Sequence, residues 1–109
     1  MMNAEKISEI IATYEKHGWV LRRVLLSAVL KSDVGSELFN GVQIVESDFN
    51  AAWFSRPPQP GGVAWEIRYL GDVAFAFVEN IDEYSGEFED DLRRVEMRLR
   101  DTVASKRSA

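Results

Sequence analysis

The sequence predicts a two-layer α+β domain, in which an antiparallel meander of four or five strands carries the N- and C-terminal helices on one face. Three observations support this fold class. Apolar residues recur at helical spacing near each end of the chain, short β-rich segments alternate with turn residues between them, and the connections are short, which favours antiparallel neighbours. We expect a chain of 109 residues to form one core rather than two, so residues 1–109 are predicted to be a single domain.

The helices are predicted at residues 4–17 and 85–105. The first has an apolar stripe at the spacing i, i+3, i+4, i+7, formed by Ile7, Ile10, Ile11 and Tyr14. Asn3 is a suitable N-cap, and Gly18 is a suitable left-handed residue after the last turn. The second helix has a similar stripe, formed by Phe88, Leu92, Val95, Leu99 and Val103. Its expected i,i+4 ion pairs are Glu89–Arg93, Asp90–Arg94 and Glu96–Arg100. These pairs predict a solvated outer face.

The strands are predicted between the helices, at residues 19–30, 42–46, 51–56, 63–70 and 73–79. These segments are rich in β-branched and aromatic residues, and the first is apolar on both faces, as a buried strand is. Residues 57–62, PPQPGG, end one strand, because proline cannot donate to a sheet ladder and glycine permits a tight reversal. The sequence does not distinguish whether residues 31–48 form a loop, a short helix or an extra strand.

The pattern W-x-x-R occurs twice, from Trp53 to Arg56 and from Trp65 to Arg68. Side chains alternate along a strand, so the tryptophans lie on one face of the predicted hairpin and the arginines on the other. With Trp53 opposite Trp65, the tryptophan face consists of Trp53, Trp65, Ile67, Tyr69, Val73, Phe75 and Phe77. We expect this aromatic face to set the register and to receive both helices. The arginine face consists of Ala52, Phe54, Arg56, Ala64, Glu66, Arg68, Ala74, Ala76 and Val78.

The arginine face is the candidate functional surface, because a solvated sheet face normally carries threonine, lysine and glutamate rather than alanine. Its candidate partner- or ligand-binding residues are Phe54, Arg56, Glu66 and Arg68. In one interpretation, Glu66 simply bridges Arg68 on a partly exposed sheet. In a second, the face is a homodimer or protein-partner interface, where arginine is enriched. In a third, Arg56 and Arg68 hold a small anionic ligand between them.

The composition excludes several classes of function. A formal net charge of −5 with dispersed basic residues argues against nucleic-acid binding, which needs a positive patch. The chain has no cysteine, which excludes thiol catalysis, and His17 is the only histidine, so it has no second histidine as a metal partner. No nucleotide-binding or nucleophile motif is present, so we predict no catalytic residue, no metal and no cofactor. No signal peptide or membrane-spanning run is visible, and we expect a cytoplasmic protein.

The sequence therefore predicts a non-enzymatic protein-interaction module, of the adaptor or chaperone kind, that forms a homodimer or binds another protein. In size, acidity, absence of cysteine and helix–sheet order it resembles the small dimeric chaperones of bacterial secretion systems. This is a resemblance of composition, and it carries no residue over. The alternative is a domain that binds an anionic small molecule or acts as an enzyme. It requires a pocket between sheet and helices with convergent polar groups, lined by Trp53, Trp65, Tyr69 or Tyr14.

Overall fold

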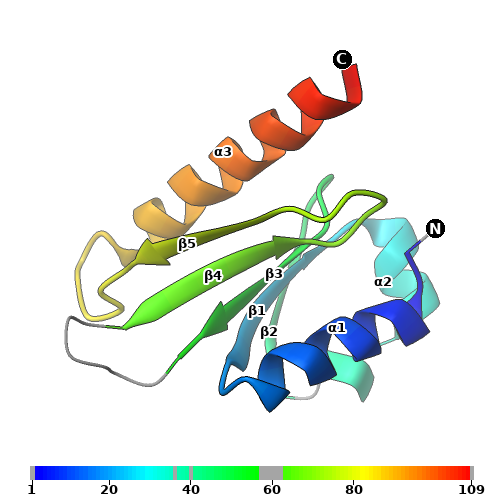
Figure 1. The fold of residues 1–109 in the computed structure, drawn as a ribbon, viewed down its shortest axis with the longest axis horizontal. Coiled ribbons are helices and arrows are strands. Elements are labelled where there is room, and N and C mark those ends of the chain that lie inside the picture. The colour runs from blue at the N-terminus through cyan, green and yellow to red at the C-terminus, as the bar shows by residue number, and fades with distance from the viewer. Residues whose placement is uncertain (1, 36, 40, 57–62, 109) are drawn as a thin grey trace.

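The computed structural model describes residues 2–35, 37–39, 41–56 and 63–108, and it contains a five-stranded sheet with helices on both sides (Figure 1). The helices are α1 (Ala4–Lys16), α2 (Ala28–Val34), the 3-10 turn η1 (Glu37–Phe39) and α3 (Phe88–Ser108). The strands are β1 (Val20–Leu26), β2 (Gln43–Glu46), β3 (Ala51–Ser55), β4 (Ala64–Tyr69) and β5 (Ala76–Asn80). The sheet has the order β2-β1-β3-β4-β5, and β1 with β2 is its parallel pair. The predicted α+β class is confirmed, and the sheet is antiparallel except for the pair of β1 and β2.

The two terminal helices lie on opposite faces of the sheet, so the predicted packing of both on one face is wrong. α3 packs on the tryptophan face, where Leu99 joins a core with Trp53 and Trp65. α1 packs on the arginine face, where Ile7 joins a second core with Phe54. Figure 1 shows α3 above the sheet and α1 below it. The domain therefore has three layers and two cores, so the expectation of a single core is wrong. Each helix carries an apolar stripe, and each sheet face offers its own apolar residues to cover it.

The ends of α1 follow the predicted capping pattern. The Asn3 side chain accepts a hydrogen bond from the backbone N–H of Lys6 at 2.9 Å. Gly18 has a φ of 88°, which a residue with a Cβ rarely adopts, and it ends the helix. α3 begins at Phe88, later than predicted, and the Ser85 hydroxyl accepts from a backbone N–H just before it. No helix in the described part of the chain is long and apolar enough to cross a membrane.

The first predicted strand ends early, at Leu26. Ser27 then caps the short helix α2, because its hydroxyl accepts a backbone N–H from the first turn at 3.2 Å. The chain continues through η1 to β2, which pairs with β1 at the edge of the sheet. Residues 31–48 therefore contain the end of a helix, a 3-10 turn and a strand, and the meander is limited to β3, β4 and β5. The Pro/Gly loop predicted at residues 57–62 lies outside the described residues.

The register of the hairpin differs from the predicted one by two residues. Trp53 lies opposite Ile67, and Trp65 lies opposite Ser55. A shift of two residues leaves every side chain on its predicted face, since side chains alternate with a period of two. Trp53, Trp65 and Ile67 accordingly share the core under α3. β5 begins at Ala76, so the connection that precedes it is longer than predicted.

Candidate functional site

α1 covers only part of the arginine face. Its Tyr14 ring stacks on Phe54, with ring centroids 4.0 Å apart and an interplanar angle of 8°, and Phe54 is fully buried. Phe54 is therefore a core residue here rather than an exposed contact residue. Towards β5 the same face stays open, and Val78 is 58% exposed. We call this part the open face; it consists of Ala64, Glu66, Arg68, Ala74, Ala76 and Val78.

Glu66 lies where α1 meets the open face. Its carboxylate accepts a hydrogen bond from the Tyr14 phenol. No ion pair joins Glu66 to Arg68, so the predicted bridge between these two side chains does not form. Burial of the phenol, together with the hydrogen bond to Glu66, raises the pKa of Tyr14. The phenol therefore stays protonated into the alkaline range and keeps donating to Glu66, which links α1 to β4.

Arg56 and Arg68 do not converge on one ligand site. The Arg56 guanidinium donates to the carbonyl oxygen of His17 at 2.7 Å and lies 5.2 Å from the ring centroid of Trp19, beside the end of α1. The Arg56 backbone N–H donates to the Ala64 carbonyl at 3.0 Å. Arg68 lies four residues further along β4 than Ala64, which is about 13 Å along an extended strand. An anion held between these two arginines therefore has no support in the structure.

Arg56 and Arg68 nevertheless share one property that sets them apart. The arginines that form an ion pair with a carboxylate are Arg22, Arg23, Arg93, Arg94, Arg98 and Arg100. Among the residues whose side chains are described, Arg56 and Arg68 have no such partner. Arg68 donates from Nε to the Tyr69 carbonyl at 3.1 Å and lies beside the Tyr14 phenol, whose pKa its charge acts to lower, and a guanidinium has five N–H donors in all. Arg68 therefore retains donors for a carboxylate that approaches the open face.

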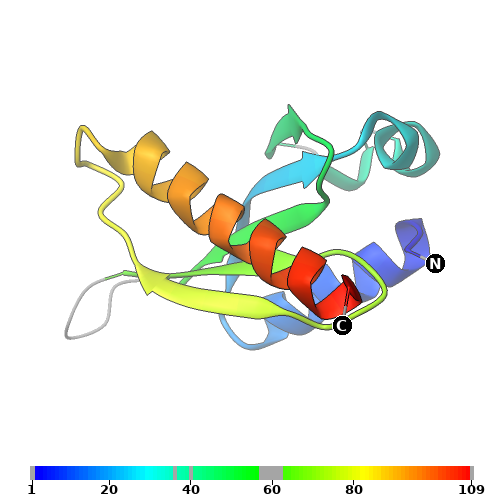
Figure 2. The same ribbon diagram turned by 90° about the horizontal axis from the view of Figure 1, so that it is seen from above.

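β5 is the outer strand of the sheet, and no strand pairs with its outer edge in the described chain (Figure 2). The Tyr69 backbone N–H donates to the Phe75 carbonyl at 2.8 Å. In an antiparallel ladder, hydrogen-bonded and non-hydrogen-bonded residue pairs alternate, so the backbone groups of Phe77 point to β4. The residues whose backbone N–H and C=O groups point to the open edge are Ala76, Val78 and Asn80. The same residues place their side chains on the α1 side of the sheet.

The edge of β5 carries few of the features that usually protect an edge strand. Such strands carry charged residues, proline or bulges that prevent pairing with another chain. Residues 73–78, VAFAFV, contain no charged residue and no proline. Glu79 is the charged residue of β5, and it lies on the α3 face, where it pairs with Arg98. The Arg98 guanidinium also lies 4.7 Å from the ring centroid of Phe77. The open face and the edge of β5 are therefore the candidate functional site.

Two arginines outside the predicted site connect β1 to the α3 layer. The register between β1 and β3 shifts between Leu21 and Arg23, and this bulge allows Arg22 and Arg23 to lie on the same side of the sheet. Arg22 pairs with Glu83 at 2.7 Å, and Arg23 pairs with Glu89 at 2.8 Å. The signal in the sequence is two adjacent arginines inside an apolar strand, since regular alternation would place one of them in each core.

Glu96 is a buried carboxylate, although the charge pattern of α3 predicts it on the solvated face. It accepts a hydrogen bond from the Trp53 indole N–H at 2.7 Å, and its Oε2 lies 3.9 Å from Nε of Arg23. Burial raises the pKa of Glu96, against the lowering effects of the Trp53 hydrogen bond and the Arg23 charge. The predicted pair with Arg100 does not form, because Arg100 binds Asp48. The ion pairs described within α3 are Asp90–Arg93 and Asp91–Arg94.

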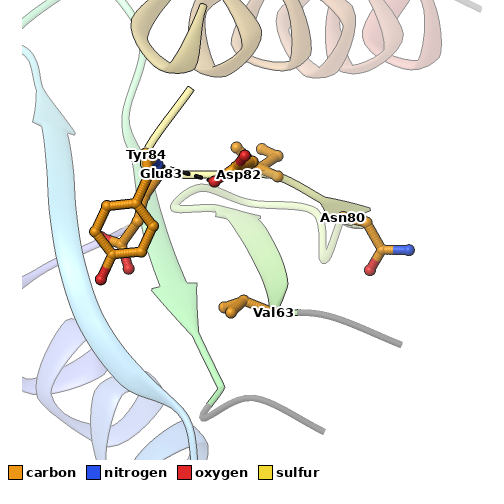
Figure 3. A pocket seen from close by; sticks show the side chains of 6 residues that line it. Val63, Asn80, Asp82, Glu83 and Tyr84 are labelled. Atoms are coloured by element: carbon orange, nitrogen blue, oxygen red, sulfur yellow. Dashed lines mark hydrogen bonds between the residues drawn. The ribbon is translucent and has the colours of Figure 1, made fainter. Parts of the chain in front are cut away.

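Two neighbouring cavities lie at the end of the sheet beside the segment before α3. One of about 460 Å³ is lined by Val20, Arg22, Ser55, Arg56, Val63, Glu83 and Tyr84. The other, of about 320 Å³, is lined by Val63, Asn80, Ile81, Asp82, Glu83 and Tyr84, and Figure 3 shows Glu83 and Tyr84 pointing to the same side of it. Trp53 and Trp65, expected to line a pocket in the alternative hypothesis, are buried in the core and line neither cavity. The described residues contain no cluster of three or more metal-ligating side chains.

Comparisons of the chain with protein-family models, with curated proteins and with solved structures found no match. The candidate site therefore rests on the geometry of this structure alone. It consists of the open face, the outer edge of β5, and Arg68 with hydrogen-bond donors that are not all used.

Proposed function

We propose that the protein is a protein-interaction module whose first partner is a second copy of itself. The two copies pair through the outer edge of β5, so that the sheet continues from one copy into the other. The observation that carries this proposal is the stretch of residues 73–78 without a charged side chain along this edge, with Val78 58% exposed beside it.

An antiparallel pairing centred on Val78 matches the backbone directions of β5. The N–H and C=O groups of Val78 point to the open edge, so they bond with the same groups of Val78 in the second copy. Ala76 of each copy then bonds with Asn80 of the other. On the α3 side, Glu79 lies opposite Phe77 and not opposite a second Glu79, so like charges are not placed in direct contact.

Pairing also brings the two open faces together. The symmetry axis of such a pair is perpendicular to the sheet, so both open faces lie on the same side, between the two α1 helices. They form one continuous floor in which Ala76, Val78 and Asn80 of the two copies meet, and each copy contributes one Arg68 to it. An apolar centre with arginine suits a protein interface.

We therefore propose that the dimer is an adaptor that binds a segment of a client protein on this floor, with Arg68 bound to an acidic side chain of the client.

Two variants of Val78 test the edge pairing. Val78→Pro removes a backbone N–H that makes no hydrogen bond within one copy, and proline is tolerated at such a position of an edge strand. This variant should remain folded and lose the dimer. Val78→Lys keeps the N–H but adds a charge to the open face, and it should weaken the dimer. Val29→Lys is the matched control, because Val29 is 71% exposed on α2, outside the open face.

Light scattering on a sizing column at several protein concentrations measures the mass. Pairing predicts twice the 12.4 kDa of one chain for the natural protein and for Val29→Lys, and the mass of one chain for Val78→Pro. Circular dichroism checks that each variant is folded. A natural protein with the mass of one chain at every concentration, or a dimer that survives Val78→Pro, would contradict the proposal.

A further inference from the structure

We infer that Arg98 and Glu79 form an ion-pair network across the β5–β5 interface, and that this network fixes its register and makes it selective for a second copy of the same chain. The inference rests on the proposed function. It adds the side chains that determine which partner and which alignment the edge accepts.

Within one copy, Arg98 already contacts two side chains of β5. Its guanidinium pairs with Glu79 and lies 4.7 Å from the ring centroid of Phe77. The Arg98 side chain is 54% exposed, and the Glu79 side chain is 30% exposed. A guanidinium has five donors in a planar fork, so one that binds a single carboxylate retains donors for a second. Arg98 is therefore a charged group at the edge of the sheet with unused hydrogen-bonding capacity.

Pairing centred on Val78 brings a second carboxylate to this guanidinium. In that register, Glu79 of the second copy lies opposite Phe77, and facing residues of an antiparallel pair have Cβ atoms about 4.5–5.5 Å apart. The guanidinium above Phe77 is then also above the incoming Glu79. The symmetry repeats the arrangement for Arg98 of the second copy. The two arginines and two glutamates alternate, and such a network is stronger than an isolated exposed pair.

The network distinguishes the Val78 register from its nearest alternatives. A slip that centres the pairing on Ala76 keeps the faces aligned but places Phe77 opposite Phe75 of the other copy. A slip that centres it on Asn80 places Phe77 beyond the partner strand. In both cases Glu79 of the second copy no longer lies opposite Phe77, beneath the Arg98 guanidinium. A strand from another protein also offers Arg98 no second carboxylate, unless that strand carries an acidic residue opposite Phe77. Selectivity for a second copy thus follows from the spacing of Phe77 and Glu79 along one strand.

Charge reversal tests the network, with the dimer dissociation constant measured by analytical ultracentrifugation. Arg98→Glu and Glu79→Arg should each weaken the dimer by about tenfold or more, because like charges then meet at the interface. The double variant with both reversals should return to within about threefold of the natural dimer, since opposite charges meet again. Arg100→Glu is the matched control, because it changes the charge equally on the same helix, at a residue that binds Asp48 and not β5.

The outcomes separate this inference from the proposed function. If Arg98→Glu and Arg100→Glu weaken the dimer equally, or if the double variant is no tighter than the single ones, the network is refuted. A natural dimer that Val78→Pro dissociates would still support edge pairing in that case. A natural protein that stays monomeric refutes both. Circular dichroism of each variant checks that the charge reversals leave the fold intact.

Discussion

Tyr14→Ala should lower the free energy of unfolding by about 3 kcal/mol, because Tyr14 links α1 to the sheet through both its ring and its hydroxyl group. The ring stacks on Phe54, and the phenol donates to Glu66. If α1 lay on the tryptophan face, as the sequence predicts, neither contact would exist. The variant therefore tests the three-layer arrangement directly.

The expected loss of unfolding free energy has a polar part from the hydroxyl group and an apolar part from the ring. Tyr14→Phe keeps the ring and should cost about 1 kcal/mol, since water can replace the lost donor at the half-buried Glu66. Truncation to alanine also removes the stacked ring. An aromatic pair contributes about 0.5–1.5 kcal/mol beyond the area it buries, and burial of this half-exposed ring contributes about 1.5 kcal/mol more. The higher helix propensity of alanine returns about 0.5 kcal/mol.

Urea unfolding followed by tryptophan fluorescence measures these differences. Protein concentration must be held fixed, because self-association makes stability depend on it. Tyr84→Ala is the matched control: Tyr84 is 90% exposed, so its removal should change stability by less than about 0.5 kcal/mol. Equal effects of Tyr14→Ala and Tyr84→Ala would refute the docking of α1 on the arginine face.

Two further predictions concern the core and the loop before β5. Glu96→Gln should flatten the dependence of stability on pH, because burial raises the pKa of Glu96 above the ordinary value of 4.5. At pH values between 4.5, the pKa in the unfolded chain, and the raised pKa in the folded protein, the folded protein binds more protons than the unfolded chain. The free energy of unfolding therefore falls as pH rises through that window. Thermal melts at several pH values measure this slope, and an unchanged slope in the variant would contradict it. Gly71→Ala should destabilise the protein by about 1–3 kcal/mol, because a Cβ there overlaps the Tyr69 ring, which stacks on Phe49. Gly86→Ala meets no atom within 4 Å and should change stability by less than about 0.5 kcal/mol, so equal effects of the two glycine variants would rule out the close approach.

The faces of the hairpin could be predicted from the sequence because they depend only on alternation. Trp53 and Trp65 lie on one face and Arg68 on the other, although the actual register differs from the predicted one by two residues. An even shift does not exchange the faces of a strand. The caps of α1 were predictable for a similar reason, since Asn3 and Gly18 act through local backbone geometry.

The position of each helix could not be predicted, because it depends on contacts between distant segments. The apolar stripe of α1 fits an alanine-containing face as well as an aromatic one, and Ala52 is in fact buried in the α1 core. Alanine on a strand indicates an open face, and this indication holds towards β5 and fails under α1. The parallel pairing of β2 and the bulge at Arg22 also have no local signal strong enough to predict them.

The candidate site was predictable in part. Arg68 and Glu66 lie at the open face, whereas Phe54 belongs to the core and Arg56 to the end of α1. The sequence pattern does not predict the roles of Glu96 and of the arginine pair in β1. Glu96 lies four residues after Leu92, on the flank of the apolar stripe of α3, and this position was the available signal for its burial.

Hydrogen exchange at the Val78 backbone amide, measured by NMR, tests the pairing of β5 most directly. The amide of Phe77 points to β4 and serves as the reference within the same strand. Pairing through the open edge predicts that the Val78 amide is protected to a similar degree as the Phe77 amide. Exchange of the Val78 amide at the rate of an unstructured peptide, with Phe77 protected in the same sample, would show that the edge of β5 is free and would contradict the proposed dimer.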